Sequence, residues 1–305
     1  MIYLYRKKEN LIYELHTLTL AVFILSIFFL ALLFTHPLYL TSLMFITSLL
    51  LITSGNLKEW KGYLKFSLPL VGIIIIVNTL FVRVGSTVLY SGPRVPVIGR
   101  IRITLEALIY GGAMGLRLLI IISIFCLFTY TVQPDRFMKL FGKFSSKLIF
   151  IIILSIRLFP LMVEDFERIT EVQKTRGVSI ENDSFINKVK KTLPMVSVLL
   201  LSSLERSFEQ AESMYSRGYA TGRRIIYKKD IKRTRDKIIF SATGVGLTAG
   251  IISYTWGYTT YTYYPELANL NLPDYNLYFI FLITLMVPSL LNWGCKKWPK
   301  LKSKI

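Results

Sequence analysis

The sequence predicts an all-α membrane protein with about six transmembrane helices and a cytoplasmic domain of long helices inserted before the last two. The chain has 305 residues and is 53% hydrophobic, and its apolar residues come in separate blocks. A helix needs roughly 20 apolar residues to cross the hydrocarbon layer of a bilayer, and several blocks reach or approach that length. Most of the formal net charge of +19 lies between the blocks, where basic residues orient the spans.

Four spans are expected in the N-terminal part of the chain. A tight break at His36-Pro37 separates the first two, because proline disfavours helical backbone at the residue before it. A polar connection, residues 54–65, precedes the third span, and a loop, residues 83–102, precedes the fourth. The expected spans are residues 17–35, 38–53, 66–82 and 103–131.

The fourth span differs from the other expected spans because it contains charged residues. Glu106 lies near one end and Arg117 in the middle, eleven residues apart. A single pair at this distance indicates structural contacts inside the membrane rather than a proton or ion relay. Gly111 and Gly115 in the same span form a small-xxx-small pair, which permits close approach of a neighbouring helix.

Long helices are expected in the cytoplasmic domain. A helix-start signal at Pro134 precedes an amphipathic segment, residues 136–147. Residues 148–163 are apolar, but they are short for a span and carry Arg157. We therefore predict that they pack within a membrane-adjacent helical domain. A further helix is expected over residues 185–216.

Two more spans are expected after a strongly basic segment, at residues 238–254 and 277–291. The predicted organisation is therefore an N-terminal membrane domain of four helices (residues 1–131), a cytoplasmic helical domain (132–236), and two C-terminal membrane helices with a basic tail (237–305).

Charge predicts the orientation of the chain. Residues 157–237 hold 17 Lys and Arg against 11 Asp and Glu, whereas residues 255–275 contain no basic residue. Since cytoplasmic segments carry the basic excess, both termini are expected in the cytoplasm of a multi-pass protein of the cell membrane. Tyrosines of the outer loop are expected to form an interfacial belt: Tyr258, Tyr261, Tyr263 and Tyr264. Three outer arginines have no acidic neighbour and no explanation in the sequence: Arg94, Arg100 and Arg102.

Several classes of function find no support in the sequence. It contains no recognition helix or base-stacking sheet for nucleic acid and no glycine-rich phosphate loop. His16 and His36 are isolated, so neither a metal site nor a cofactor is expected, and we predict no enzymatic activity. Five of the six expected spans carry no charged residue, unlike the ion-coupled sites that are usual in secondary transporters.

One short pattern occurs twice in the expected cytoplasmic domain. Residues 171–177 read Glu-Val-Gln-Lys-Thr-Arg-Gly and residues 212–218 read Glu-Ser-Met-Tyr-Ser-Arg-Gly, at an offset of 41. Glycine just past a helix adopts the left-handed conformation without steric cost, and an arginine there faces the negative end of the helix dipole. An ordinary helix end explains one copy alone. Two copies at a fixed period indicate one unit used twice, as a paired docking device.

These residues resemble the transmembrane T component of energy-coupling factor transporters, the EcfT/CbiQ-like family. The resemblance covers about residues 104–224. It rests on the Arg117 helix, the run Arg157-Leu-Phe-Pro160-Leu, Pro194 and the two Arg-Gly motifs in this order. In that family, two short motifs centred on arginine close two crossed coupling helices, and each motif docks in a groove of one ATPase.

The resemblance implies a non-enzymatic transducer for uptake of a vitamin or a transition metal ion. The implied partners are two ATP-binding cassette ATPase subunits, one small substrate-binding membrane subunit that selects the substrate, and membrane lipid, without nucleic acid. The family commonly has alanine before the arginine, where this chain has another small residue. The implied ATPase-docking residues are Thr175, Arg176, Gly177, Ser216, Arg217 and Gly218.

Two other functions are weighed against this one. A stand-alone membrane permease would place Glu106 and Arg117 in its pathway. A membrane-bound enzyme that acts on lipid would need acidic residues for metal or acid–base chemistry. The candidates, whose helical spacing favours an ordinary solvated face, are Glu164, Asp165, Glu167 and Glu171.

Overall fold

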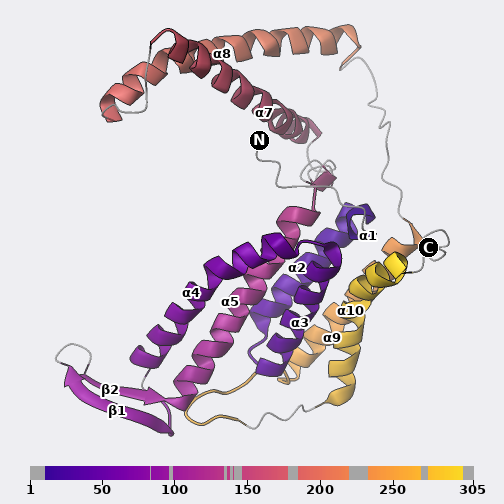
Figure 1. The fold of residues 1–305 in the computed structure, drawn as a ribbon. Helices are drawn as coiled ribbons and strands as arrows, with labels where there is room; N and C mark the ends of the chain where they lie inside the picture. Colours follow the sequence, from indigo (N-terminus) through magenta and orange to yellow (C-terminus); the bar gives the residue numbers. More distant parts are fainter. Residues whose placement is uncertain are drawn as a thin grey trace. The chain divides into compact units, whose positions relative to one another are not determined.

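The chain forms two compact units in the computed structural model, one of residues 138–230 and one that joins residues 2–137 to residues 231–305 (Figure 1). We call the first the helical unit and the second the membrane unit. The predicted domain boundaries after residues 131 and 236 stay a prediction. The structure describes residues 11–82, 84–95, 99–133, 136–137, 140, 146–177, 185–219, 233–268 and 274–297.

The membrane unit is built from helices and one small hairpin. Five of its helices, α3, α4, α5, α9 and α10, are long and apolar enough to cross a membrane, and α2 with 17 residues is slightly shorter. The predicted all-α membrane protein is confirmed. The elements are α1 (Leu11–Glu14), α2 (Thr17–Leu33), α3 (Pro37–Ser54), α4 (Leu57–Phe81), β1 (Val88–Val95), β2 (Gly99–Thr104), α5 (Leu105–Thr131), α9 (Thr234–Thr255) and α10 (Tyr275–Lys297).

The two histidines, which the sequence left isolated, begin helices. The Nδ1 atom of His16 accepts a hydrogen bond from the backbone N–H of Leu18 at 3.2 Å, at the start of α2. His36 does the same for Leu38 at 3.3 Å, at the start of α3. Each side chain thus satisfies one of the N–H groups that the first turn of a helix leaves without a partner. The predicted break at His36-Pro37 is confirmed.

Helix α4 begins nine residues earlier than the predicted third span, at Leu57 rather than residue 66. The polar connection expected at residues 54–65 is therefore mostly helical. The indole N–H of Trp60 donates to the hydroxyl of Ser123 on α5 at 2.9 Å, which fixes the first turn of α4 against the bundle. This contact joins residues 63 positions apart, so the local pattern of polarity could not reveal it.

The predicted loop at residues 83–102 is wrong over most of its length, because β1 and β2 pair there as an antiparallel hairpin (Figure 1). Gly92 and Pro93, residue types that are usual in loops, fall where the strand register shifts between Ser91 and Arg94. β2 is rich in β-branched residues, which favour extended backbone.

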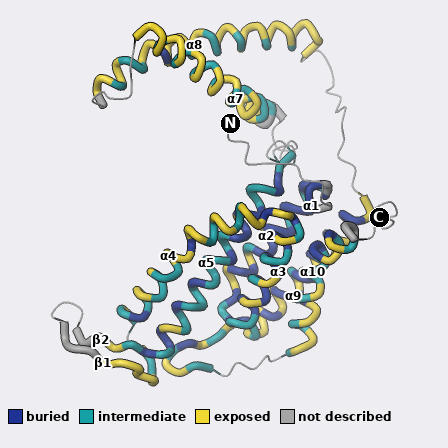
Figure 2. Tube along the Cα trace, in the orientation of Figure 1, coloured by how far each residue is buried: buried dark blue, intermediate teal, exposed yellow. Residues whose placement is uncertain are grey.

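The core of the membrane unit joins residues from both ends of the sequence. Phe34 and Tyr39 flank the α2–α3 break and pack edge to face, with ring centroids 5.2 Å apart. Phe281 of α10 packs against Phe34 at 5.6 Å. Gly250 of α9 lies so close to α2 that an added Cβ would stand 2.6 Å from Leu30 Cδ2. The last two helices thus complete the core of the first spans, where buried residues gather (Figure 2).

A buried carboxylate holds the beginning of α9 in place. Asp236 is 3% exposed, and its Oδ2 atom accepts from the backbone N–H of Arg233 at 2.8 Å, in the manner of a helix cap. Its Oδ1 atom accepts from the backbone N–H of His16 at 2.9 Å. One side chain therefore caps α9 and ties it to the beginning of α2, 220 positions away in the sequence.

Replacing Asp236 with alanine is expected to lower the free energy of unfolding by about 2–4 kcal/mol, because a cap is lost and the N–H of His16 loses its acceptor. Thermal unfolding of the purified chain in detergent would measure the change. Asp274→Ala is a matched control, since the Asp274 carboxylate accepts a local bond from the N–H of Asn276 at an exposed helix start. An equal loss in both variants would contradict the special role of Asp236.

The helical unit contains two long helices, α7 (Ser146–Thr175) and α8 (Phe185–Ser216). The prediction of a helix over residues 185–216 is confirmed. The apolar segment 148–163 forms the first half of α7, which continues through Pro160 without a break. The predicted amphipathic segment 136–147 lies mostly outside the described residues.

Candidate functional site

Helices α7 and α8 end with the same backbone geometry at the doubled motif. Gly177 has φ +83° and Gly218 has φ +77°, the left-handed region that glycine enters without a Cβ clash. The N–H of Gly177 donates to the carbonyl of Lys174 at 3.0 Å, and the N–H of Gly218 donates to that of Tyr215 at 2.9 Å. The predicted helix ends are thus confirmed in both copies, with glycine at the residue that stops the helix.

The small residue before each arginine closes the last helical turn. The Thr175 hydroxyl donates to the carbonyl of Val172 at 2.7 Å. The Ser216 hydroxyl donates to that of Ser213 at 3.0 Å. The carbonyl of Val172 also accepts from the backbone N–H of Arg176 at 3.3 Å, so the Thr175 hydroxyl adds a hydrogen bond at the helix end that alanine could not make.

Arg176 and Arg217 follow directly after the last helical residue, and both side chains are exposed. Neither guanidinium has an ion pair or hydrogen bond within the described part of the chain. Each stands at the negative end of a helix of 30 residues or more, which favours a cation there. Two exposed cations on similar helix ends are therefore available to a binding partner.

The C-terminal ends of α7 and α8, which precede the two arginines, lie at opposite ends of the helical unit (Figure 1). Phe150, near the beginning of α7, stacks on Tyr219, just past the end of α8, with ring centroids 5.3 Å apart. The helices therefore run antiparallel. Arg176 follows Phe150 by 26 residues, which at a rise of about 1.5 Å per residue gives about 40 Å along α7. Since Arg217 is two residues from Tyr219, about the same distance separates the two arginines.

Comparison with known proteins identifies the family. Residues 12–227 match the family described as cobalt transport protein, CbiQ. The chain belongs to this family. Curated relatives named energy-coupling factor transporter transmembrane protein EcfT are similar to it. One from Listeria innocua is 28% identical over 53% of this chain and 63% of the relative. One from Streptococcus equi is 29% identical over 54% of this chain and 63% of the relative.

A third relative of the same name, from Streptococcus thermophilus, is 30% identical over 59% of this chain and 71% of the relative. The chain thus spans less than two thirds of the length of the first two relatives. The family match includes both Arg-Gly motifs, which lie within residues 12–227.

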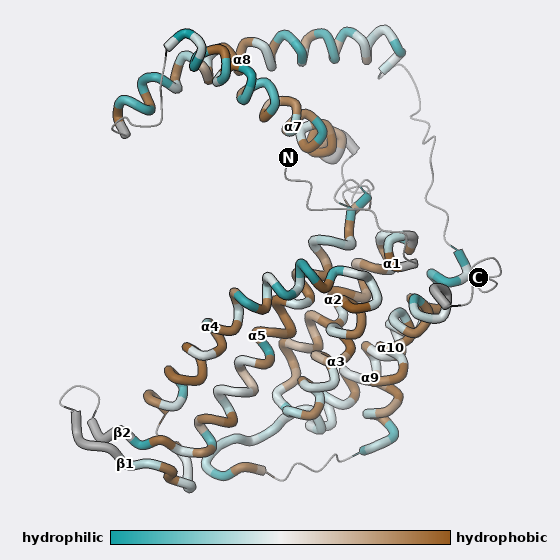
Figure 3. Tube along the Cα trace, in the orientation of Figure 1, coloured by the Kyte–Doolittle hydropathy of each residue, from teal (hydrophilic) through white to brown (hydrophobic). Residues whose placement is uncertain are grey.

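In this CbiQ-family chain, many large apolar residues of α7 and α8 are exposed, and the residue colours show burial and hydropathy along both helices (Figures 2 and 3). Phe159 is 66% exposed and Phe208 is 68% exposed. Packing of the two helices against each other therefore leaves apolar surface uncovered on both of them. Ten of the exposed apolar residues lie in two stretches, residues 148–159 of α7 and residues 196–204 of α8. They are Leu148, Ile151, Ile152, Ile156, Phe159, Val196, Val198, Leu200, Leu201 and Leu204.

An ion pair joins the two helices between the arginine ends. A terminal nitrogen of Arg206 on α8 lies 2.6 Å from Oδ2 of Asp165 on α7, and Asp165 is 16% exposed at its side chain. Asp165, which the lipid-enzyme alternative needed as a catalytic group, is thus occupied in a contact between helices. The other acidic candidates remain on exposed or partly exposed positions of α7: Glu164, Glu167 and Glu171.

A double-mutant cycle on Asp165→Ala and Arg206→Ala is expected to give a coupling energy of about 0.5–1 kcal/mol, since Arg206 is partly exposed to solvent. Thermal unfolding of the four proteins at low and high salt would measure it, and salt should reduce it. The matched cycle pairs Glu164→Ala with Arg206→Ala and should give no coupling. Equal coupling in the two cycles would contradict a specific Asp165–Arg206 bond.

Glu106 and Arg117 each contact backbone or side chains within the membrane unit. Oε1 of Glu106 accepts from the N–H and hydroxyl of Thr87 at 2.9 and 2.7 Å and from the Ser86 hydroxyl at 3.2 Å. A terminal nitrogen of Arg117 donates to the carbonyl of Phe34, the residue that closes the end of α2. Both side chains thus hold segments that connect helices. These bonds favour the interpretation that Glu106 and Arg117 make structural contacts, which stays a prediction.

The tyrosine loop contributes contacts that sequence reasoning missed. Tyr263 is 5% exposed, and its hydroxyl donates to the carbonyl of Thr35 at 2.7 Å. The N–H groups of Thr35 and His36 both donate to the carbonyl of Thr259. Burial raises the pKa of Tyr263 to about 12, so it remains a protonated donor at neutral pH. The belt interpretation is wrong for Tyr263, which bonds the α2–α3 break rather than the membrane interface.

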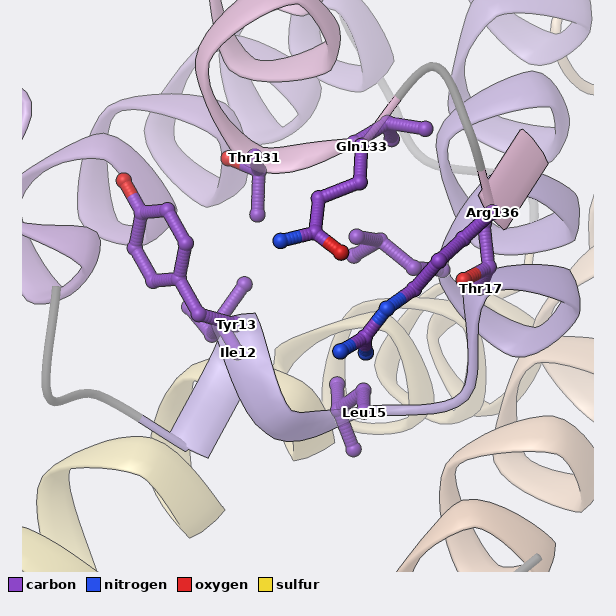
Figure 4. Close-up of a pocket in the computed structure, with 9 residues that line it drawn as sticks. Ile12, Tyr13, Leu15, Thr17, Thr131, Gln133 and Arg136 are labelled. Carbon is purple, nitrogen blue, oxygen red and sulfur yellow. The ribbon is translucent and has the colours of Figure 1, made fainter. Parts of the chain in front are cut away.

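A small hollow opens between α1 and the end of α5, and the Arg136 side chain extends into it beside Gln133 (Figure 4). It has room for about one water molecule. Among the residues that the structure describes, no three His, Cys, Asp or Glu side chains come together as metal ligands. The hollow does not adjoin the doubled motif in sequence, and the candidate site remains the pair of arginine-bearing helix ends.

Proposed function

We propose that this chain is the transmembrane transducer of an energy-coupling factor importer, joining two ATP-binding cassette ATPases to a small substrate-binding membrane subunit. The observation that carries the proposal is the pair of identical, exposed Arg-Gly ends on antiparallel helices. Two equivalent anchors suit a partner that is itself two-fold or pseudo-two-fold, as a pair of ATPases is. The names of the relatives, which are energy-coupling factor transporter components, support it.

The separation of the anchors suggests how the chain would transmit motion. With the arginines about 40 Å apart, each would rest on a different ATPase subunit. Closure of the ATPases on ATP would then displace one helix end relative to the other. The Asp165–Arg206 ion pair and the Phe150–Tyr219 stack join α7 to α8. The displacement would therefore act on both helices and change the angle at which they cross.

The exposed apolar faces of α7 and α8 would transmit that change to the membrane. Leu200 and Leu201 are 58% and 59% exposed, and apolar area of this kind favours contact with a membrane subunit or lipid. The helical unit and both termini would lie in the cytoplasm, as the basic residues of the central segment indicate. Substrate choice, a vitamin or a transition metal ion, would belong to the separate binding subunit.

The test is recovery of the tagged chain from membranes in a mild detergent, followed by mass spectrometry of the proteins that accompany it. We expect two P-loop ATPase subunits and a small hydrophobic membrane protein. Recovery of the chain alone, under conditions that preserve other membrane complexes, would contradict the transducer and favour the stand-alone permease. Transport by the chain reconstituted without ATPase would do the same.

A further inference from the structure

The β1–β2 hairpin places three arginines on one face and the Tyr90–Ile103 pair on the other. Successive residues of a strand belong to opposite faces, and residues opposite each other in an antiparallel ladder belong to the same face. The register pairs Arg94 with Arg100, and Arg102 stands two residues further along β2. These three positions therefore share one face. Tyr90 pairs with Ile103, and this pair belongs to the other face.

The basic face has no compensating charge in its own part of the chain. Residues 82–105 contain four arginines and no Asp or Glu. The nearest carboxylate in the sequence, Glu106, is 1% exposed and already accepts bonds from Ser86 and Thr87. Like charges directly opposite each other destabilise an antiparallel pair. The pairing of Arg94 with Arg100 would therefore be stabilised by an anionic group beside it.

Several large apolar side chains at and beside the hairpin are exposed. Leu89 is 58% exposed and Tyr90 59%, and Phe81 at the end of α4 is 63% exposed. The hairpin connects the ends of α4 and α5, which are both long and apolar enough to cross a membrane (Figure 1). It therefore lies near the level where lipid phosphates meet acyl chains, the level that arginine and tyrosine favour.

We infer that the β1–β2 hairpin is a lipid anchor, whose basic face binds the phosphate groups of anionic lipids while its apolar face enters the hydrocarbon boundary. An anionic lipid surface offers phosphates and acyl chains side by side, which matches a hairpin with one basic and one apolar face. The inference also accounts for three arginines that the orientation of the chain leaves unexplained. It does not depend on which leaflet the hairpin meets.

A spin label at residue 90 tests the inference. Tyr90→Cys in a Cys295→Ser background carries the label, and Cys126 is buried and protected from it. The full chain is reconstituted in phosphatidylcholine vesicles with and without phosphatidylglycerol. Collisions with oxygen, which concentrates in lipid, are compared with collisions with a water-soluble nickel complex. We expect phosphatidylglycerol to shift the label from water toward lipid. The partition coefficient of the hairpin should rise about a hundredfold, because each of the three arginines contributes about fivefold.

Two triple variants and one control make the test specific. Arg94→Gln, Arg100→Gln and Arg102→Gln together should abolish the response to phosphatidylglycerol, whereas the same three changes to lysine should retain it. The control is Lys58→Gln, Lys61→Gln and Lys65→Gln, which removes the same charge from the other end of α4 and should leave the response intact. A triple glutamine variant that responds like the parent would overturn the inference. The inference would also be overturned if the label stayed in water with both lipid mixtures and was shielded only in the complex with partner proteins. That result would assign the hairpin to a protein interface.

Discussion

Replacing Arg176 and Arg217 together with alanine is expected to release the ATPase subunits from the chain while leaving its fold intact. Both side chains are exposed and make no hydrogen bond or ion pair within the described residues, so truncation removes only a small favourable interaction with the helix dipole. A charge-assisted hydrogen bond contributes about 1.5–3 kcal/mol, so loss of both arginines should weaken docking by a hundredfold or more, at about 1.4 kcal/mol for each factor of ten. The stoichiometry of ATPase recovered with the tagged chain measures the effect.

The single variants and a matched control separate docking from bulk charge. Each single variant should keep part of the ATPase, because the second anchor holds the pair at a high effective concentration. Arg168→Ala combined with Lys190→Ala removes the same charge from exposed positions of α7 and α8 that are not helix ends, and full recovery is expected. Full recovery with the Arg176→Ala and Arg217→Ala double variant would show that the arginines do not dock the ATPases.

The helix ends could be predicted because their signal is local. A glycine after an amphipathic run specifies a left-handed stop by its own conformational freedom, and both Gly177 and Gly218 adopt it. The bounds of α8 followed from the same kind of signal. The repeat at a fixed offset then marks the two ends as equivalent positions. What the sequence does not show is that the helices run antiparallel, since that rests on Phe150 meeting Tyr219.

Two of the errors share one physical cause, which is contact between residues distant in the sequence. The lysines of residues 54–65 (Lys58, Lys61 and Lys65) indicated a polar connection, but Trp60 packs the segment against α5 as a helix. The tyrosine loop was expected to form an interfacial belt because aromatic residues favour that level, but Tyr263 bonds a carbonyl 228 positions away. Local propensity cannot anticipate either partner.

Gly115→Leu is expected to destabilise the membrane unit strongly, by about 1–3 kcal/mol or more, because α4 and α5 touch at this residue. A Cβ at Gly115 would stand 2.6 Å from Cγ1 of Val71, a short and stiff β-branched side chain. A Cβ at Gly111, one turn earlier, would stand 3.1 Å from the Ile75 backbone. Neither neighbour can withdraw unless α4 moves as a whole, so Gly111→Leu should destabilise as well.

Gly112 provides the matched control for this prediction, because a Cβ there would meet nothing within 4 Å. Gly112→Leu should be neutral or slightly stabilising, since leucine favours a helix more than glycine does. Thermal unfolding of the three variants in one detergent makes the comparison. A similar loss at residues 112 and 115 would mean that any bulk on α5 is harmful, and that the small-xxx-small pair does not set the distance between α4 and α5. The opposite result would establish that a spacing visible in the sequence fixes the packing of α4 on the core.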